Sequence, residues 1–363
     1  MTQDTLGEQV RTVAALPPGS APFSPFSPRG ELSSYLLNLL SGPGMDGVGE
    51  LATIGDHALA RAGEVITDDD VQLSLFALYS LAYGSFDAFG DRWEWSPELI
   101  RLRTDLEHAF ESALRERIRP PELPAATAGA VAEALFGLTA PAPSGPSLSR
   151  YVAKHATAEQ VREFLVHRSI YTLREADPHS WAIPRLTGRA KAALVEIQAD
   201  EYGGGNPGRM HSAIFAGTVR GAGLCDHYGH YVDHVPAVTL ASHNLMSMFG
   251  INRRLRGAVV GHLAAFEMTS SIPNRHYGDG FRRLGFGPEV TWYFDEHVEA
   301  DAVHEQIAGH DMAGSLAEDE PALLEDIMFG AMACLRVDDW VGAHLLDAWQ
   351  EGRSSLRKPL TEA

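Results

Sequence analysis

Apolar residues recur every three or four positions along most of the chain, a spacing typical of helices that bury one face. Alternating runs of β-branched residues, which would indicate strands, are almost absent. In the first third of the chain the pattern predicts helices over residues 33–41, 50–61, 69–83, 97–117 and 128–138. Beyond it, helices are predicted over residues 157–176, 185–201, 207–222, 234–250, 254–270, 289–309 and 320–350. The last helix is expected to be broken once, and the predicted fold class is all-α.

Two segments rich in proline and serine interrupt the helical pattern. Residues 17–29 favour an extended leader, and residues 138–149 indicate either a domain boundary or a long surface loop. The predicted organisation is a flexible leader over 1–30, an N-terminal helical region over 31–115 and a second helical domain over 116–353. The N-terminal region is a candidate dimerisation surface.

Glycine and proline mark helix ends in the second half of the chain. The run Gly203–Gly205 is expected to end one helix, and Asn206–Pro207 offers an N-cap followed by proline at the first helical position. The pair Ile272–Pro273 is expected to end another helix, because proline disfavours helical geometry in the residue before it. Glu267 is therefore expected near a helix end.

The composition limits the partners and the compartment. A formal net charge of −19 argues against nucleic acids and anionic membrane surfaces, because such partners need basic patches. The first residues lack the basic start and apolar run of a secretory signal, and no stretch approaches the roughly 18 apolar residues of a membrane span. Cys225 and Cys334 are far apart in sequence, so neither a disulfide nor a thiolate metal site is indicated. We expect a cytoplasmic protein with a small-molecule partner.

The most informative stretch for chemistry is FDEHVEADAVHEQI, which begins at Phe294. Within it, His297, Asp301 and His304 are spaced at i, i+4 and i+7, so one helix face presents all three. Two imidazoles and a carboxylate on one stripe suit a divalent iron or manganese ion. The alternative is a solvent-exposed charged helix, which the neighbouring glutamates also resemble.

A second candidate cluster lies in VEIQADEYGGGNPGRMH, where Glu201 precedes His211 by ten residues. Ten residues is a poor helical repeat, but the glycine run ends one helix and Asn206–Pro207 begins the next. The two side chains can then face a common centre across the junction. The alternative is an ordinary turn with a histidine that hydrogen-bonds near a helix start.

Two further glutamates complete a possible set of ligands. Glu175 follows the largely apolar segment FLVHRSIYTLR, and Glu267 stands alone in LAAFEMTSS, where burial would be costly without a compensating partner. Metal coordination is one such compensation, and an exposed position or an arginine partner is the alternative. Four carboxylates and three imidazoles from separate helices suit two iron ions. Of the paired Glu-x-x-His motifs of ferritin-type sites, the chain supplies only the related pair Asp301 and His304.

In these two motifs and in the order of all seven residues, the chain resembles the haem-oxygenase-like diiron oxidases and oxygenases, also called iron-containing redox enzymes. The resemblance covers roughly residues 110–350. It implies a haem-oxygenase-like multi-helix bundle, here with an N-terminal helical extension. The metal ligands that it implies are Glu175, Glu201, His211, Glu267, His297, Asp301 and His304.

The resemblance also implies cofactors, partners and a reaction. The cofactors would be two iron ions, with O2 as co-substrate and electrons from an external donor such as a reductase or ferredoxin. The protein would be a homodimer that oxidises a small amine or amino-acid-like metabolite in specialised metabolism. The chemistry would be N-oxygenation, desaturation or oxidative C–C cleavage.

Substrate selection is expected to fall to residues beside the metals. Tyr202, Arg209 and Arg275 are candidates for binding a substrate carboxylate, because a guanidinium binds one in a bidentate manner. Their alternative role is in structural ion pairs or packing. Three more histidines in the region are interpreted as supporting or surface groups, namely His167, His179 and His276.

Two other functional classes remain open from the residues. One is a haem-binding or haem-degrading protein on the same fold, with one histidine as the axial ligand. That reading leaves most of the carboxylates unexplained. The other is a metal-free helical interaction protein whose polar clusters are ion-pair networks.

Overall fold

The computed structural model of the chain describes residues 25–42, 47–119, 122–141 and 145–360, except for the side chains of residues 299–302. The chain is 76% helical, and the described ranges contain no strand. The all-α prediction is confirmed. None of the described helices is long and apolar enough to cross a lipid bilayer.

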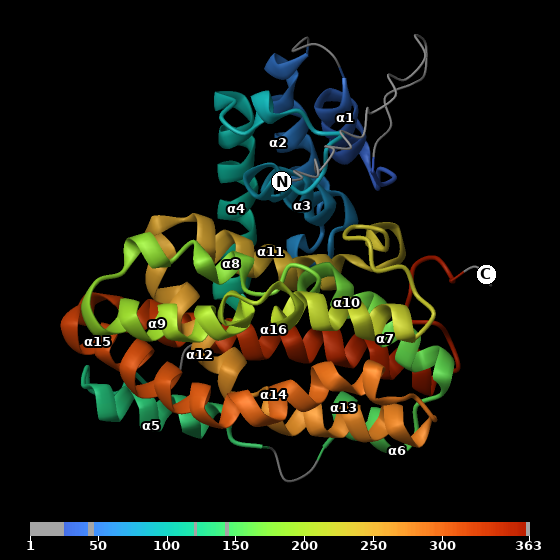
Figure 1. Cartoon of the computed structure of the whole chain (residues 1–363). Coiled ribbons are helices and arrows are strands. Elements are labelled where there is room, and N and C mark those ends of the chain that lie inside the picture. Colours follow the sequence, from blue (N-terminus) through green and yellow to red (C-terminus); the bar gives the residue numbers. More distant parts are fainter. Residues whose placement is uncertain (1–24, 43–46, 120–121, 142–144, 361–363) are drawn as a thin grey trace, which may run out of the picture.

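Four helices near the N-terminus stack on one end of the molecule (Figure 1, blue to teal). They are α1 (Glu31–Ser41), α2 (Leu51–Arg61), α3 (Asp69–Tyr83) and α4 (Pro97–Arg117). Helix α3 begins after Asp68, whose carboxylate accepts hydrogen bonds from the backbone N–H groups of Asp70 and Val71. Every residue from Val71 to Ser80 is buried, because α3 packs on α1 on one side and on α11 of the larger bundle on another.

The remaining helices form the larger bundle. They are α5 (Ala128–Thr139), α6 (Leu148–Lys154), α7 (Ala158–Thr172), α8 (Asp177–Ser180), α9 (Gly188–Glu201), α10 (His211–Gly221), α11 (Ala237–Ile251), α12 (Arg256–Met268), α13 (Ser271–Arg283), α14 (Pro288–Gln306), α15 (Ser315–Asp319) and α16 (Leu324–Gln350). A π-helix, η9 (Ile307–Gly314), joins α14 to α15. One hydrophobic core extends from Phe26 to Leu356 and includes both groups of helices.

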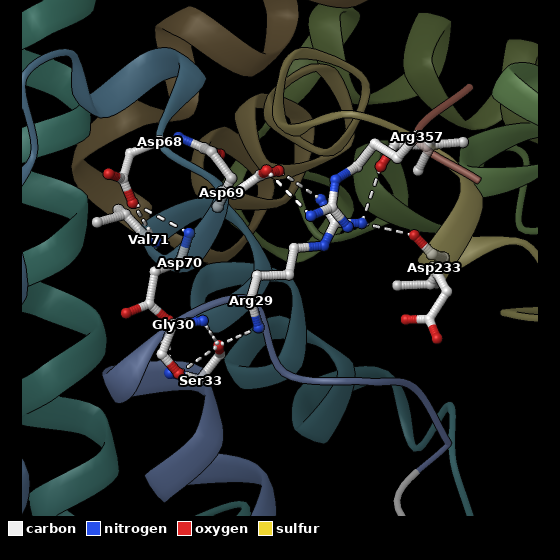
Figure 2. A network of polar contacts seen from close by, with 12 residues as sticks. Arg29, Gly30, Ser33, Asp68, Asp69, Asp70, Val71, Asp233 and Arg357 are labelled. Atoms are coloured by element: carbon white, nitrogen blue, oxygen red, sulfur yellow. Dashed lines mark hydrogen bonds and ion pairs between the residues drawn. The ribbon is translucent and has the colours of Figure 1, made fainter. Parts of the chain in front are cut away.

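Two arginines tie the N-terminal helices to the loop after α10 and to the C-terminal tail (Figure 2). The side chain of Arg29 is only 1% exposed and forms a 2.9 Å ion pair with Asp69 at the start of α3. Its other terminal nitrogen donates hydrogen bonds to the carbonyl oxygens of Val232 and Val235. Arg357 in the tail binds the second oxygen of Asp69 at 3.2 Å. Two guanidinium groups therefore share one carboxylate, and segments distant in sequence are fixed to one another.

Glycines allow α12 and α16 to pack with their backbones in close contact. A Cβ atom added at Gly261 would lie 1.8 Å from the carbonyl oxygen of Ile327, and one at Gly330 would lie 2.0 Å from that of Ala258. Only residues without a side chain fit at such a distance. Because α12 also contains Glu267, this contact fixes the position of a candidate metal ligand along α16.

Most predicted helices agree with the structure within a few residues, but the prediction around Pro273 was wrong. The helix containing Glu267 does end at Met268, yet a new helix, α13, starts at Ser271 and includes Pro273 in its first turn. Proline is tolerated there because the first N–H groups of a helix have no partner within that helix. The first intrahelical bond of α13 is donated by the N–H of Asn274, one residue later.

Three other helix predictions need correction. The segment 320–350 was expected to break once, but α16 is continuous from Leu324 to Gln350. The segment 157–176 ends early, at Thr172, so Glu175 lies in a turn after α7. The segment 289–309 changes to π-helix at Ile307.

Substituting Gly261 by alanine is expected to destabilise the protein by about 3 kcal/mol, because the methyl group would overlap the backbone of α16. Chemical denaturation measures this change in the free energy of unfolding. The matched control is Gly137→Ala, at an exposed helical glycine whose added Cβ meets nothing within 4 Å. The control is expected to be neutral or stabilising. Equal stability of the two variants would contradict the close contact.

Candidate metal centre

Glu201 and His211 are brought together by the glycine junction between α9 and α10. Glu201 is the last residue of α9, and the following glycines, Gly203–Gly205, have φ values of 70°, 57° and 84°, which favour glycine. The side chain of Asn206 then caps a short 3-10 turn, and α10 begins at His211. The result is a distance of 3.0 Å from Nδ1 of His211 to Oε2 of Glu201.

Helix α14 presents two histidines on one face, as their spacing predicted. Nε2 of His297 lies 3.6 Å from Oε1 of Glu175, and Nδ1 of His304 lies 3.4 Å from Oε2 of Glu267. Asp301 lies on the same helix, but its side chain is outside the described part of the chain. Its role as a ligand stays a prediction.

Glu175 is positioned by an unusual turn after α7. The next residue, Ala176, has φ 74°, the only described non-glycine residue with a positive φ. Such a conformation persists only where neighbours enforce it. Here the side-chain amide of Gln198 donates a 2.9 Å hydrogen bond to the carbonyl oxygen of Ala176, whose own N–H donates to the hydroxyl of Tyr171. The strained turn directs the Glu175 carboxylate into the bundle, where it is buried.

The six described candidate ligands form two groups that share one residue. The first group is Glu175, Glu201, His211 and His297, and the second is Glu201, Glu267 and His304. Within each group, one potential ligand atom per residue lies within 4.8 Å of the others. All six side chains are buried. Glu201 is common to both groups.

The donor set fits two metal ions. Each of the three carboxylates lies beside a histidine, and the side chains supply only nitrogen and oxygen, the donors that non-haem iron prefers. Oε2 of Glu175 is buried without a hydrogen-bond partner in the described part of the chain. An unsatisfied buried carboxylate oxygen is costly, and a metal ion at this position would satisfy it.

Tyr293 supports the first group, and sequence reasoning missed it. Its hydroxyl donates a 2.7 Å hydrogen bond to Oε1 of Glu175, and its carbonyl oxygen lies 2.8 Å from Nδ1 of His297. A proton on Nδ1 satisfies that carbonyl and leaves Nε2 free to bind a metal. The available signal was the position of Tyr293 one helical turn before His297.

Burial and neighbouring groups shift the pKa values of Glu175, Tyr293 and His304. Burial would raise the pKa of Glu175, but hydrogen bonds and charge from His297, together with His211 and Tyr293, outweigh it and lower this pKa below its ordinary value. Glu175 therefore remains ionised. Burial, with a further contribution from Glu175, raises the pKa of Tyr293 well above its ordinary value, so its hydroxyl stays a donor. Burial opposes protonation of His304, but Glu267 prevails and raises the pKa of this imidazole.

Other polar residues surround the candidate ligands. The exposed carboxylate of Asp200 lies 3.2 Å from Nε2 of His304. His179, interpreted from sequence as a supporting or surface group, is buried beside the centre and lies 3.1 Å from Nδ1 of His262. Burial lowers the pKa of His179 to about 4, so this imidazole is neutral near pH 7. His167 is also buried, and bonds Thr239 at 2.7 Å.

None of the three predicted substrate-binding residues lines the cavity between the candidate ligands. The hydroxyl of Tyr202 bonds the carboxylate of Asp177 at 2.9 Å, and Arg209 forms a 2.8 Å ion pair with Glu296. Arg275 is exposed on α13. Their proposed role in binding a substrate carboxylate stays a prediction.

Comparison with known proteins identifies the class. Residues 162–339, just under half of the chain, match the model of the iron-containing redox enzymes. The matched region includes all seven predicted ligands and has the helical, haem-oxygenase-like fold of the family. No curated protein sequence shows a significant match to the chain. This match supports an iron-dependent oxidoreductase, and the buried glutamate and histidine cluster is compatible with metal binding.

Substituting Tyr293 by phenylalanine is expected to weaken ferrous iron binding by roughly 10-fold to 100-fold, because the hydroxyl that orients Glu175 is lost. Anaerobic titration with ferrous iron measures the affinity. The control is Tyr35→Phe, which removes a 2.9 Å hydrogen bond to the carbonyl oxygen of Gly47 far from the centre. An equal loss of affinity in the two variants would rule out a specific role for Tyr293.

Proposed function

We propose that this protein is a non-haem diiron oxidase or oxygenase that uses O2 to oxidise a small amine or amino-acid-like metabolite. The observation that supports a two-metal site best is the presence of Glu201 in both ligand groups. A single-metal site would not need two groups of buried donors joined by one carboxylate. The proposed ligand set is Glu175, Glu201, His211, Glu267, His297, Asp301 and His304.

In this proposal, the ligands would hold two iron ions, which would supply the electrons for the reduction of dioxygen, with an external donor such as a reductase or ferredoxin replacing those electrons. The residues of the chain would position the ligands and limit the access of water. Glu201 holds the two positions at a fixed separation, while Tyr293 fixes the carboxylate of Glu175 and the ring of His297. Buried Leu263 and the aromatic ring of Phe266 line the cavity beside the ligands and limit access of water.

The size of the central cavity favours metal ions over haem. The space between the ligands is about 10 Å³ and is lined by the glutamates and His297. This volume is far below that of a porphyrin. A haem-binding function would also leave Glu175, Glu201 and Glu267 buried without metal coordination to offset their desolvation.

Iron stoichiometry tests the shared carboxylate. The wild-type protein loaded anaerobically is expected to bind about two irons per chain, as two-metal sites do. Glu201→Ala removes a ligand from both groups, so it is expected to lose both irons, whereas Glu267→Ala is expected to retain the one held by the first group. Metal analysis and Mössbauer spectroscopy measure occupancy. Two irons retained in Glu201→Ala would refute a bridging role.

The matched control for these variants is Glu296→Ala. Glu296 lies on α14 next to His297, but its carboxylate binds Arg209 and the indole N–H of Trp292 on the outside of the bundle. It is expected to bind iron as the wild type does. Far-ultraviolet circular dichroism of every variant shows whether loss of iron reflects loss of the fold.

A further inference from the structure

A large cavity lies on the side of the bundle formed by α5, α6 and α13, the lower edge in Figure 1, and reaches inward to α7 and α16. Its volume is about 700 Å³, within the range of roughly 300–1,000 Å³ that is usual for ligand sites. Much of its wall is apolar and includes Phe136, Leu148, Phe164, Met268 and Leu345. We call this cavity the outer chamber.

The outer chamber is linked to the metal centre through a second cavity of about 50 Å³, the inner cavity. The two cavities share His167, Arg168, Asp338 and Val341 as wall residues. The inner cavity in turn shares Tyr171 and Phe266 with the space between the metal ligands. Single layers of side chains therefore separate the outer chamber from the inner cavity, and the inner cavity from the candidate metals.

Two opposite charges stand where the outer chamber meets the inner cavity. Arg168 lies on α7 and Asp338 on α16, and each lines both cavities. Neither forms a hydrogen bond or an ion pair with any described residue, although the two attract each other electrostatically. Asp338 is exposed and Arg168 is half-buried, and both line the outer chamber.

This situation differs from that of other enclosed arginines in the protein. Arg29 uses its guanidinium on Asp69 and two carbonyl groups, and Arg185 donates to the carbonyl oxygens of Gly250 and Ile251. The half-buried guanidinium of Arg168 lies over the ring of Phe164, at 6.0 Å from its centroid, and none of its N–H donors bonds another described group. These donors are therefore available to a ligand bound in the outer chamber.

We propose that the outer chamber is the substrate site and that Arg168 and Asp338 bind the carboxylate and the ammonium group of a zwitterionic substrate with an apolar body. This inference rests on the proposed diiron function and specifies its substrate. A substrate with only a carboxylate would satisfy Arg168 but face the charge of Asp338. A substrate with only an amine would leave the guanidinium unpaired. A molecule with both charges matches the two groups at once.

The placement of the charges also orients the substrate. Arg168 and Asp338 lie at the inner end of the chamber, so the charged end of the substrate points toward the metals. The apolar body occupies the outer part, against residues such as Phe136 and Met268. Oxidation is therefore directed to the amine nitrogen or to the carbons beside it, and not to the far end of the apolar body.

Binding of three matched probes tests this assignment. The probes are 2-aminodecanoate, decanoate and decylamine, which share an apolar chain and differ in their charged groups. Isothermal titration is carried out on the full-length protein, both iron-loaded under anaerobic conditions and metal-free. 2-Aminodecanoate is expected to bind at least about tenfold more tightly than either other probe, as one additional charged hydrogen-bonded contact provides. Equal binding of decanoate, or no binding of any probe, would overturn the proposal.

Single substitutions separate the two contacts. Arg168→Gln is expected to weaken 2-aminodecanoate and decanoate by about tenfold or more and to spare decylamine, whereas Asp338→Asn should weaken 2-aminodecanoate and decylamine and spare decanoate. Arg168→Lys keeps the charge and should recover part of the affinity. Unchanged binding in Arg168→Gln would contradict the proposal.

The chamber offers matched controls for both variants. Arg150 lines the outer chamber but donates to the carbonyl oxygen of Gly145, and Asp339 lines it but pairs with Arg336 at 3.7 Å. Arg150→Gln and Asp339→Asn are expected to bind all three probes as the wild type does. Because the metal-free protein is measured as well, selective binding there would support the chamber even if the iron experiments failed. An effect of the controls equal to that of Arg168→Gln and Asp338→Asn would contradict the specific roles of the pair.

Discussion

Burial of three carboxylates at one point in the bundle is the constraint on which the rest of the structure depends. Each carboxylate loses its hydration, which costs several kcal/mol without compensation. This cost is offset by a histidine beside each of Glu175, Glu201 and Glu267, and each histidine comes from a different segment than its glutamate. Glu201 then belongs to both halves of the centre. The helices are fixed so that these groups meet, and the charge that remains is suited to metal ions.

The supports of this centre lie in different layers of the structure. Close to it, Tyr293 and the strained turn at Ala176 orient the carboxylate of Glu175. One layer away, glycine contacts between α12 and α16 fix the helix that contains Glu267. Farther out, Arg29 joins the N-terminal helices to the loop after α10, and Arg357 joins them to the C-terminal tail through the same carboxylate of Asp69. The N-terminal helices share the hydrophobic core of the bundle, so they belong to the same packed body.

Most of the helices and the approach of several candidate ligands could be predicted from the sequence, because both depend on the local spacing of residues. The face shared by His297 and His304 follows from helical periodicity, and the approach of His211 to Glu201 follows from the glycine run. The start of α13 was missed because a proline in a first turn resembles a helix end. Tyr293 and the strained turn at Ala176 depend on contacts between distant segments, which no local pattern shows.

The cavities and the charge pair could not be predicted from the sequence, because they too depend on contacts between distant segments. Their positions show how a bound substrate could be held at a fixed place relative to the metals. Arg168 lies on the helix that leads to Glu175, and Asp338 lies on α16, which packs against the helix of Glu267. The proposed substrate contacts therefore sit on helices that lead to, or pack against, the segments bearing the metal ligands. A site built on helices holds its geometry more closely than one built on loops. The position of a bound zwitterion relative to the metals would then be set by the same packing that brings the buried carboxylates together.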